Sequence, residues 1–234
     1  MHPADGLPPG QRAIDAFPRW GLPRFVRQRP TVPRSPALRL GGDVRRPHDL
    51  PLEALATVPR REQLSDLHCV ATWTRRRLHW SGWLLRDVYE QLIVPRAAPR
   101  ADARFAVFHG LDGYRTRLPL EDAFAADVLL ADALDGRPLS LAHGAPLRLV
   151  APAHYGYKSA KHVCGIELWR EPPEPVTQDW REHPRARVAL EERGSVLPGW
   201  AFRVVYRAFL PLMLRAYLPP ARRSGPRRDE QCSR

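Results

Sequence analysis

The chain has 234 residues, of which 44% are hydrophobic, so it can bury the core of one ordinary domain with tails or a small appendage. Its three cysteines, Cys69, Cys164 and Cys232, form no Cys-x-x-Cys pair, which argues against a disulfide framework, a zinc ribbon and a covalently attached haem. The formal net charge of +12 raises the question of an anionic partner such as nucleic acid or a membrane surface.

The N-terminal segment 1–16 is rich in proline and glycine and has no periodicity, which predicts a disordered arm. It holds no charged region followed by an apolar run, so no export signal is visible and we expect a cytoplasmic protein. The ordered domain is expected over residues 17–172. A C-terminal extension rich in proline and arginine is expected over 173–234.

Apolar runs separated by turn residues predict the first elements of this domain. Residues 38–44, which include a Gly-Gly pair, predict a short strand. Pro51 is expected to open a helix of about two turns that Pro59 ends. Apolar residues at the spacing of a helix predict an amphipathic helix over 84–94, closed by Pro95.

Strands dominate the second half of the domain. Segments 104–109 and 114–118 predict a hairpin, and a helix is expected to begin at Pro119. The apolar runs 147–151 and 163–169 predict buried strands. Strands and short helices mix without a regular β-α-β repeat, which favours an α+β fold.

Residues 200–218 are apolar apart from three arginines, with Pro211 in the middle. The charges and the proline make a spanning helix a poor fit. An interfacial helix or a partner-docking segment is one interpretation. Packing on its own domain is the other.

All but two of the 37 basic residues are arginine, and the two lysines, Lys158 and Lys161, lie three apart. Lysine offers a compact ammonium charge where arginine offers a planar fork, so the pair suggests a local need for ammonium groups. Chance is the alternative explanation.

Cys69 stands in the segment His68-Cys69-Val70, followed by Trp73 and by Trp80-Ser81-Gly82-Trp83. A thiolate is a soft ligand suited to molybdenum, and a lone cysteine cannot build a zinc site. A lone cysteine is also common as a buried hydrophobe, so its neighbours must decide.

Further motifs follow in order: Asp112-Gly113-Tyr114, Leu118-Pro119-Leu120, Val128-Leu129-Leu130-Ala131, Asp135-Gly136-Arg137-Pro138-Leu139, the run from His143 to Pro152, and the run from Tyr155 to Lys161. With the Cys69 segment they resemble the sulfite oxidase-like family of molybdopterin oxidoreductases over roughly residues 17–170. The resemblance implies a mixed-sheet α+β domain that binds molybdenum through molybdopterin in its simple form, without an appended nucleotide.

The resemblance also implies roles for individual residues. Cys69 is expected to ligate the metal, and Tyr114 falls where the family carries an active-site tyrosine, although a half-buried strand tyrosine would look the same. Five residues match positions that hold the pterin in the family: His143, Arg148, Ser159, Ala160 and Lys161. Lys158 lies beside them in the sequence. A guanidinium, two ammonium groups and a hydroxyl suit the negative charges of a pterin phosphate and dithiolene.

Two segments depart from the family or leave alternatives open. Arg19 matches a residue that reaches the cofactor, but Trp20 and Gly21 replace a polar pair, which puts the family's sulfite pocket in doubt. Arg75, Arg76 and Arg77 could supply that charge, or form a solvated face. His109 could donate a hydrogen bond to the cofactor or cap its strand.

The expected activity is two-electron oxygen-atom transfer on a small-molecule substrate, with sulfite oxidation and sulfoxide reduction as specific candidates. The chain shows no second redox centre, so electrons need a separate partner. A membrane haem protein met by residues 200–218 is one candidate, and contact with a membrane surface is another role for that segment. The alternative, a non-enzymatic basic protein binding nucleic acid or membrane, rests on the net charge and on the basic tail at 222–228. It leaves the cysteine and pterin motifs unused, so we do not expect a nucleic-acid partner.

Overall fold

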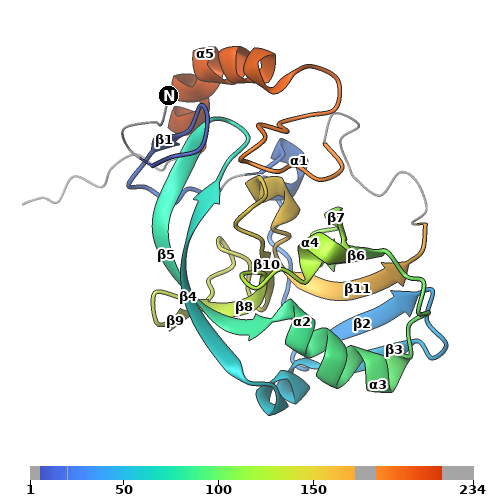
Figure 1. Ribbon diagram of the computed structural model, residues 1–234. Coiled ribbons are helices and arrows are strands. Elements are labelled where there is room, and N and C mark those ends of the chain that lie inside the picture. Colours follow the sequence, from blue (N-terminus) through green and yellow to red (C-terminus); the bar gives the residue numbers. More distant parts are fainter. Residues whose placement is uncertain (1–5, 20, 172–182, 218–234) are drawn as a thin grey trace, which may run out of the picture.

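The structure is a computed structural model that describes residues 6–19, 21–171 and 183–217 (Figure 1). It contains two β-sheets. The first has the strand order β1-β5-β8-β10, with β4 also paired to β5 and β9 to β8. Its strands are β1 (Arg12–Ala13), β4 (Arg60–His68), β5 (Trp73–Leu84), β8 (Leu129–Leu134), β9 (Arg137–Pro138) and β10 (Arg148–Val150).

The second sheet has the order β3-β2-β11-β6-β7. Its strands are β2 (Ala37–Gly42), β3 (His48–Pro51), β6 (Phe105–Gly110), β7 (Arg115–Pro119) and β11 (Val163–Trp169). Strand β11 pairs parallel with β2 and antiparallel with β6, so this sheet is mixed. The predicted α+β fold with mixed sheets is confirmed.

Most of the helices are short. They are α1 (Pro23–Val26), η1 (Leu52–Thr57), α2 (Leu85–Val88), η2 (Tyr89–Ile93), α3 (Val94–Ala97), α4 (Leu120–Ala123), η3 (Gly156–Lys158) and α5 (Gly199–Tyr217). No helix in the described part of the chain is long and apolar enough to cross a membrane.

Several predicted elements form. The run 38–44 gives β2, the predicted hairpin gives β6 and β7, and the two late apolar runs give β10 and β11. The amphipathic helix also forms, but its predicted end at Pro95 is wrong because the helix continues to Ala97. Pro95 is tolerated because it lies in the first turn of α3, directly after the π-helical η2.

The N-terminal segment differs from the prediction. Residues 1–5 lie outside the described residues, but 6–16 are not a disordered arm. Strand β1 pairs parallel with β5, and the Leu7 side chain is buried. The amide of Gln11 donates to the carbonyl of Cys69, at 3.1 Å, and accepts a hydrogen bond from the hydroxyl of Thr74, at 3.0 Å. The sequence did not predict this ordered segment for two reasons. It is rich in proline and glycine, and a strand of two residues is too short to show a periodic pattern.

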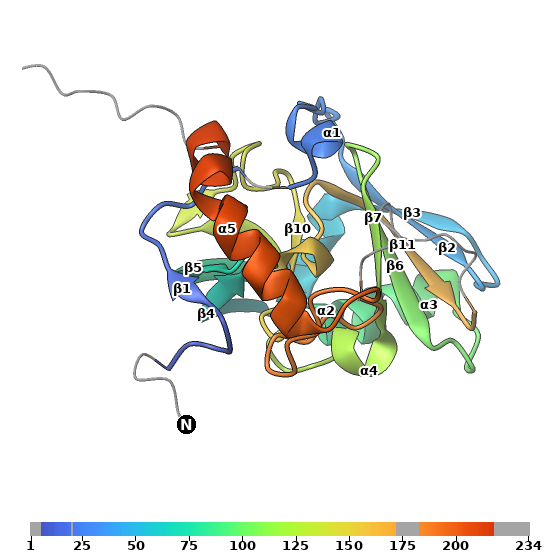
Figure 2. The ribbon, with the colours of Figure 1, turned by 90° about the horizontal axis from the view of Figure 1, so that it is seen from above.

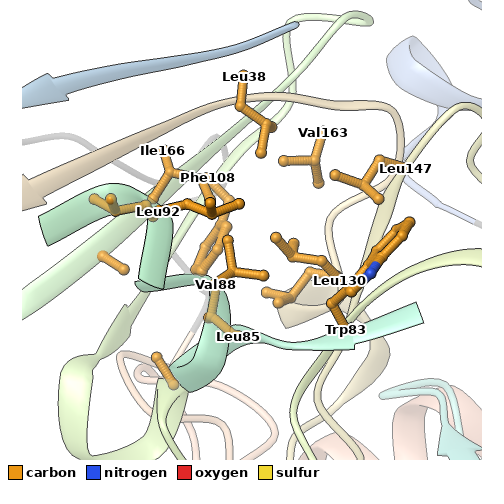
Figure 3. Packing of buried hydrophobic residues seen from close by; sticks show 14 of the residues in the cluster. Leu38, Trp83, Leu85, Val88, Leu92, Phe108, Leu130, Leu147, Val163 and Ile166 are labelled. Atoms are coloured by element: carbon orange, nitrogen blue, oxygen red, sulfur yellow. The ribbon is translucent and has the colours of Figure 1, made fainter. Parts of the chain in front are cut away.

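The main hydrophobic core lies between the second sheet, the helical segment α2-η2 and the inner strands of the first sheet (Figure 3). Side chains such as Phe108 and Ile166 come from the second sheet and Val88 from the helical segment, whereas Leu130 comes from β8. All four are 0–1% exposed. The core therefore fixes the two sheets relative to each other.

Replacement of the core ring of Phe108 by alanine is expected to destabilise the protein by about 3–5 kcal/mol, because a cavity forms where the two sheets meet. Chemical denaturation of Phe108→Ala would measure this loss. The matched control is Val94→Ala, since Val94 is 41% exposed and its truncation is expected to change stability by less than about 0.5 kcal/mol. Equal effects of the two substitutions would contradict the assignment of the core.

The C-terminal segment folds back onto the domain. Val188 N–H donates to the carbonyl of Ala153, and Tyr155 N–H donates to that of Ala186. Helix α5 then runs across the molecule near β1 and β5 (Figures 1 and 2), where Leu210 packs with Trp73. Packing on its own domain therefore holds for one face of α5. The proline cluster at 172–175 and the basic tail at 222–228 lie outside the described residues.

Candidate active site

Cys69 lies in the tight turn that joins β4 to β5, the longest hairpin of the structure. The turn closes through two hydrogen bonds, in which Cys69 N–H donates to Trp73 O (2.8 Å) and Thr72 N–H donates to Cys69 O (3.1 Å). Sequence patterns did not reveal this hairpin, because charged residues occupy both faces of β4 and the middle of β5. The Trp73 side chain, 1% exposed, anchors its inner end.

The thiol of Cys69 is buried and accepts a hydrogen bond from Ala71 N–H, at 3.4 Å. Burial raises its pKa to about 12, against the opposing effects of that hydrogen bond and of the positive charges on Arg193 and Lys161. A metal ion deprotonates a thiol that binds it, so this pKa describes the cysteine without a ligand.

Arg148 on β10 is a buried guanidinium. Its Nη1 donates to the carbonyl of His143 at 2.8 Å, and the group lies 4.8 Å from the centre of the Trp80 ring. Among the described residues its hydrogen bonds go to backbone carbonyls, and burial lowers its pKa to about 10. Because carbonyls do not neutralise it, the site holds an uncompensated positive charge.

Lys161 adds a second positive group beside Arg148. Its Nζ donates to the carbonyl of Ala142, at 3.2 Å. The pKa of this ammonium is lowered to about 7, first by burial and then by the neighbouring charges of Arg148 and Arg19, whereas Asp112 and Cys69 oppose the shift. The pKa of Lys161 therefore depends on the charges of Cys69, Arg148 and Arg19.

The loop between Ser140 and Pro146 threads past these two cations, and Gly144 makes this possible. Gly144 has φ +112°, and a Cβ there would lie 3.0 Å from Cβ of Arg148 and 3.2 Å from Cβ of Lys161. A side chain would thus be strained in its backbone and crowded against both residues. The chain needs glycine at this crossing.

His143 holds the loop against the N-terminal segment. Its ring stacks on Phe17 with centroids 4.5 Å apart, and its Nε2 lies 3.3 Å from the Phe17 carbonyl. Ser140 Oγ lies 3.2 Å from the other ring nitrogen. Burial lowers the pKa of this histidine. His143 is therefore close to the cationic pair through its backbone carbonyl, while its ring fixes Phe17.

The side chains of Lys158 and Ser159 form hydrogen bonds to backbone groups of neighbouring segments. The ammonium of Lys158, 0% exposed, donates to the carbonyl of Arg117 at 3.1 Å. The hydroxyl of Ser159 accepts from Ala151 N–H at 3.2 Å, which ties the loop to the end of β10. Ser159 also reaches the pocket described next, whereas Lys158 does not line it.

A pocket with about 540 Å³ of empty volume, partly open to solvent, opens beside this loop. Its lining includes five of the residues predicted from the sequence, namely Arg19, Tyr114, Ser159, Ala160 and Lys161. Cys69 lies outside the lining, and Lys161 connects the two because it lines the pocket and interacts electrostatically with the thiol.

The lining also has an apolar part that comes from α1 and the residues before it, which we call the apolar wall. It consists of Leu22, Phe25 and Val26. The edge of Phe25 contacts the Tyr114 ring, with centroids 5.1 Å apart, and Tyr114 Oη donates to the carbonyl of Tyr157 at 2.6 Å. Arg19 is placed by a hydrogen bond to the carbonyl of Gln28.

Other predicted residues are not brought to the pocket. His109 points to the face of β6 opposite Phe108, because side chains alternate along a strand, and its Nε2 lies 3.2 Å from the Glu167 carboxylate. Arg75, Arg76 and Arg77 follow Trp73 on β5 and do not line the pocket, and Arg76 and Arg77 both contact Asp66.

Arg193 is a buried residue near Cys69 that the sequence did not single out. Its guanidinium donates to the carbonyls of Val70 (2.7 Å) and Pro9 (2.9 Å) and pairs with Glu191 at 3.2 Å. It thereby joins the cysteine turn to segments from both ends of the chain. No local pattern marks it, since its partners are distant in sequence.

Comparison with known families decides what this arrangement is. Residues 28–176 match the family described as "Oxidoreductase molybdopterin binding domain". The chain belongs to this family. Membership identifies it as a molybdopterin oxidoreductase that binds molybdenum with molybdopterin, and the alternative of a non-enzymatic basic protein is not supported.

Two curated relatives illustrate the range of the family. The chain is 38% identical over 134 residues to "Uncharacterized oxidoreductase YuiH" of Bacillus subtilis, which covers 57% of this chain and 65% of the relative. It is 32% identical over 212 residues to "Protein-methionine-sulfoxide reductase catalytic subunit MsrP" of Xanthomonas axonopodis pv. citri, which covers 76% and 64%. The matches thus span slightly less than two thirds of each relative.

A solved structure shows the same fold. The sulfane dehydrogenase SoxCD of Paracoccus pantotrophus superimposes with a TM-score of 0.52 and 21% sequence identity, covering 63% of this chain and 40% of that chain. At this identity the likeness concerns the fold alone.

The residues present fit a molybdopterin. Its phosphate and dithiolene are anionic, and the site offers Arg148 with neutral partners and Lys161 with a lowered pKa, both of which gain from an anionic neighbour. A buried thiol lies within the electrostatic reach of the same lysine. The donor set thus matches the chemistry of the cofactor.

Proposed function

We propose that this domain reduces sulfoxides to thioethers by oxygen-atom transfer at a molybdenum ligated by Cys69. In this proposal His143, Arg148, Ser159, Ala160 and Lys161 hold the pterin, with Lys158 supporting the loop. The substrate occupies the pocket between Lys161 and α1.

The observation that carries the choice of substrate is the apolar wall formed by Leu22, Phe25 and Val26 in a pocket that Lys161 also lines. A sulfoxide carries a polar oxygen on a largely apolar molecule, so a pocket with both a charged and an apolar part suits it. Sulfite is a small anion that gains nothing from an apolar wall, and the arginine run at 75–77 does not line the pocket. The likeness to a protein-methionine-sulfoxide reductase catalytic subunit agrees with this choice.

The chemistry balances as a two-electron reduction, in which a sulfoxide, two electrons and two protons give a thioether and water. The cofactor, when bound, supplies the two-electron change at the metal. Arg19 places a positive charge at the pocket, where it would orient the sulfoxide oxygen, while Lys161 holds the pterin beside it. Phe25 packs on Tyr114, and this contact excludes water from the apolar side.

In this proposal the molybdenum cofactor is the one redox centre at the site, so a separate protein must donate the electrons to it. The MsrP relative is itself described as a catalytic subunit. A membrane haem protein is one donor of suitable chemistry.

Sulfite oxidation is the rival reaction, and the cations Arg19 and Lys161 on the pocket lining favour it. Steady-state assays of the molybdenum-loaded protein decide between the two. We expect turnover of methionine sulfoxide with a reduced dye and little turnover of sulfite with an artificial acceptor. The reverse preference would replace the proposed reaction, and inactivity with both would refute the sulfoxide assignment.

A substitution in the apolar wall adds a structural test. Leu22→Asn keeps the side-chain size but puts an amide in the wall, so kcat/KM for the sulfoxide is expected to fall roughly tenfold, or about 1.4 kcal/mol. Leu141→Asn is the control, because Leu141 is 39% exposed and does not line the pocket.

A further inference from the structure

Large exposed hydrophobic side chains gather on one part of the surface. Of the eleven that the described residues expose, eight lie between positions 190 and 212. Five of them belong to α5, namely Trp200, Val204, Val205, Phe209 and Leu212, each 49–66% exposed. Scattered single residues need no explanation, but a continuous group of this kind marks an interaction surface.

Helix α5 has two apolar faces with different partners. Leu210 is buried, and Tyr206 and Leu214, four residues to either side, pack with it against Trp73. Trp200, Val204 and Leu212 also recur at multiples of four residues and are exposed, so they form a second stripe on the outer side. The inner stripe packs on the domain, which α5 crosses in Figure 2, and the residues of the outer stripe are exposed.

The charged residues of α5 itself all have one sign. Residues 199–217 contain no acidic residue, and Arg207 and Arg215 are exposed beside the apolar stripe. The sequence continues with Arg222, Arg223, Arg227 and Arg228. An apolar stripe flanked by arginines, with a tryptophan at one end, is the composition of helices that lie in the interface of anionic membranes.

We propose that the outer face of α5 binds the surface of a membrane containing anionic lipid, with the helix parallel to the bilayer. Val204, Val205 and Leu212 enter the boundary between headgroups and acyl chains, with Trp200 and Phe209 at the two edges of this face, and Arg207 and Arg215 reach the level of the lipid phosphates. The proposal stands on surface chemistry and does not depend on the substrate or on the metal ligand.

Flotation of the full-length holoprotein with vesicles tests the proposal. We expect binding to vesicles with roughly a third phosphatidylglycerol, and binding at least about tenfold weaker to pure phosphatidylcholine. The double variant Phe209→Glu/Leu212→Glu is expected to lose binding by at least about tenfold, because it buries two carboxylates in the interface. The matched control is Leu64→Glu, since Leu64 on β4 is 56% exposed, as Phe209 is, but lies outside α5. Thermal unfolding of each variant reports whether the fold is intact.

Quenching of Trp200 by brominated lipid gives a second readout, which the variant Trp200→Phe should abolish. Three results would overturn the proposal. One is the absence of binding to anionic vesicles, and another is equal loss of binding in Leu64→Glu. The third is self-association, or capture of a protein partner, through α5 in a protein that does not bind lipid.

Discussion

Cys69→Ser is expected to remove essentially all oxygen-atom transfer, by a factor larger than the roughly 10–100-fold cost of losing a residue that only supports a metal ligand. A serine hydroxyl keeps the size of the side chain but is a hard and weakly acidic ligand for molybdenum. The turn should still form, since its two closing hydrogen bonds use backbone groups of Cys69. Metal analysis and activity assays, with circular dichroism to check folding, would measure the effect.

The matched control is Cys164→Ser. Cys164 is partly buried on β11 and has no contact with the turn, so metal content and activity should stay at the level of the unmodified protein. A Cys69→Ser variant with full molybdenum and full activity would contradict the assignment of the ligand and leave the family membership untouched.

Lys161→Met is expected to weaken retention of the pterin by about 2–5 kcal/mol, which is roughly thirtyfold or more in affinity. The reason is that the site would lose one of two cations beside an anionic ligand. Equilibrium dialysis of the released cofactor, or its fluorescence after repeated gel filtration, would measure the loss. The control Arg39→Met removes a charge whose side chain is 85% exposed on β2. Equal retention by both variants would refute a role for Lys161 in binding the pterin.

The same lysine predicts a pH dependence of the cofactor-free protein. Its pKa is lowered to about 7 in the folded state, whereas the unfolded chain keeps the ordinary value of 10.5. Between these values the unfolded state binds one more proton, so the free energy of unfolding should rise with pH, by at most ~1.4 kcal/mol per unit. Below about pH 7 the burial penalty is present in full. In Lys161→Met this slope should vanish, which urea unfolding at several pH values would show.

The segments that carry the candidate site could be singled out from the sequence because their motifs are contiguous, and their roles toward the cofactor stay predictions. His143 to Arg148 and Tyr155 to Lys161 each form one loop, and the fold brings the two loops together across Gly144. The two longest strands escaped prediction because their arginines and glutamates suit a solvated surface and hide the alternation of a strand. Amphipathic periodicity reports burial on one face, so β4, which is at least partly exposed along most of its length, and β5, which is buried along most of its length, give no such signal.

Residues that act through distant contacts also stayed hidden. Gln11, Arg193 and Leu22 reach the site from segments that carry no motif of their own. His109 lies 3.2 Å from the Glu167 carboxylate and does not line the pocket, and its role toward the cofactor stays a prediction.

The turn that carries Cys69 takes its support from both ends of the chain. Gln11 holds its carbonyl, Arg193 holds that of Val70, and Leu210 packs in the same cluster as the thiol. During synthesis, the turn is made more than a hundred residues before Arg193 and Leu210 emerge from the ribosome. The cysteine therefore reaches its final setting only after most of the chain has been made.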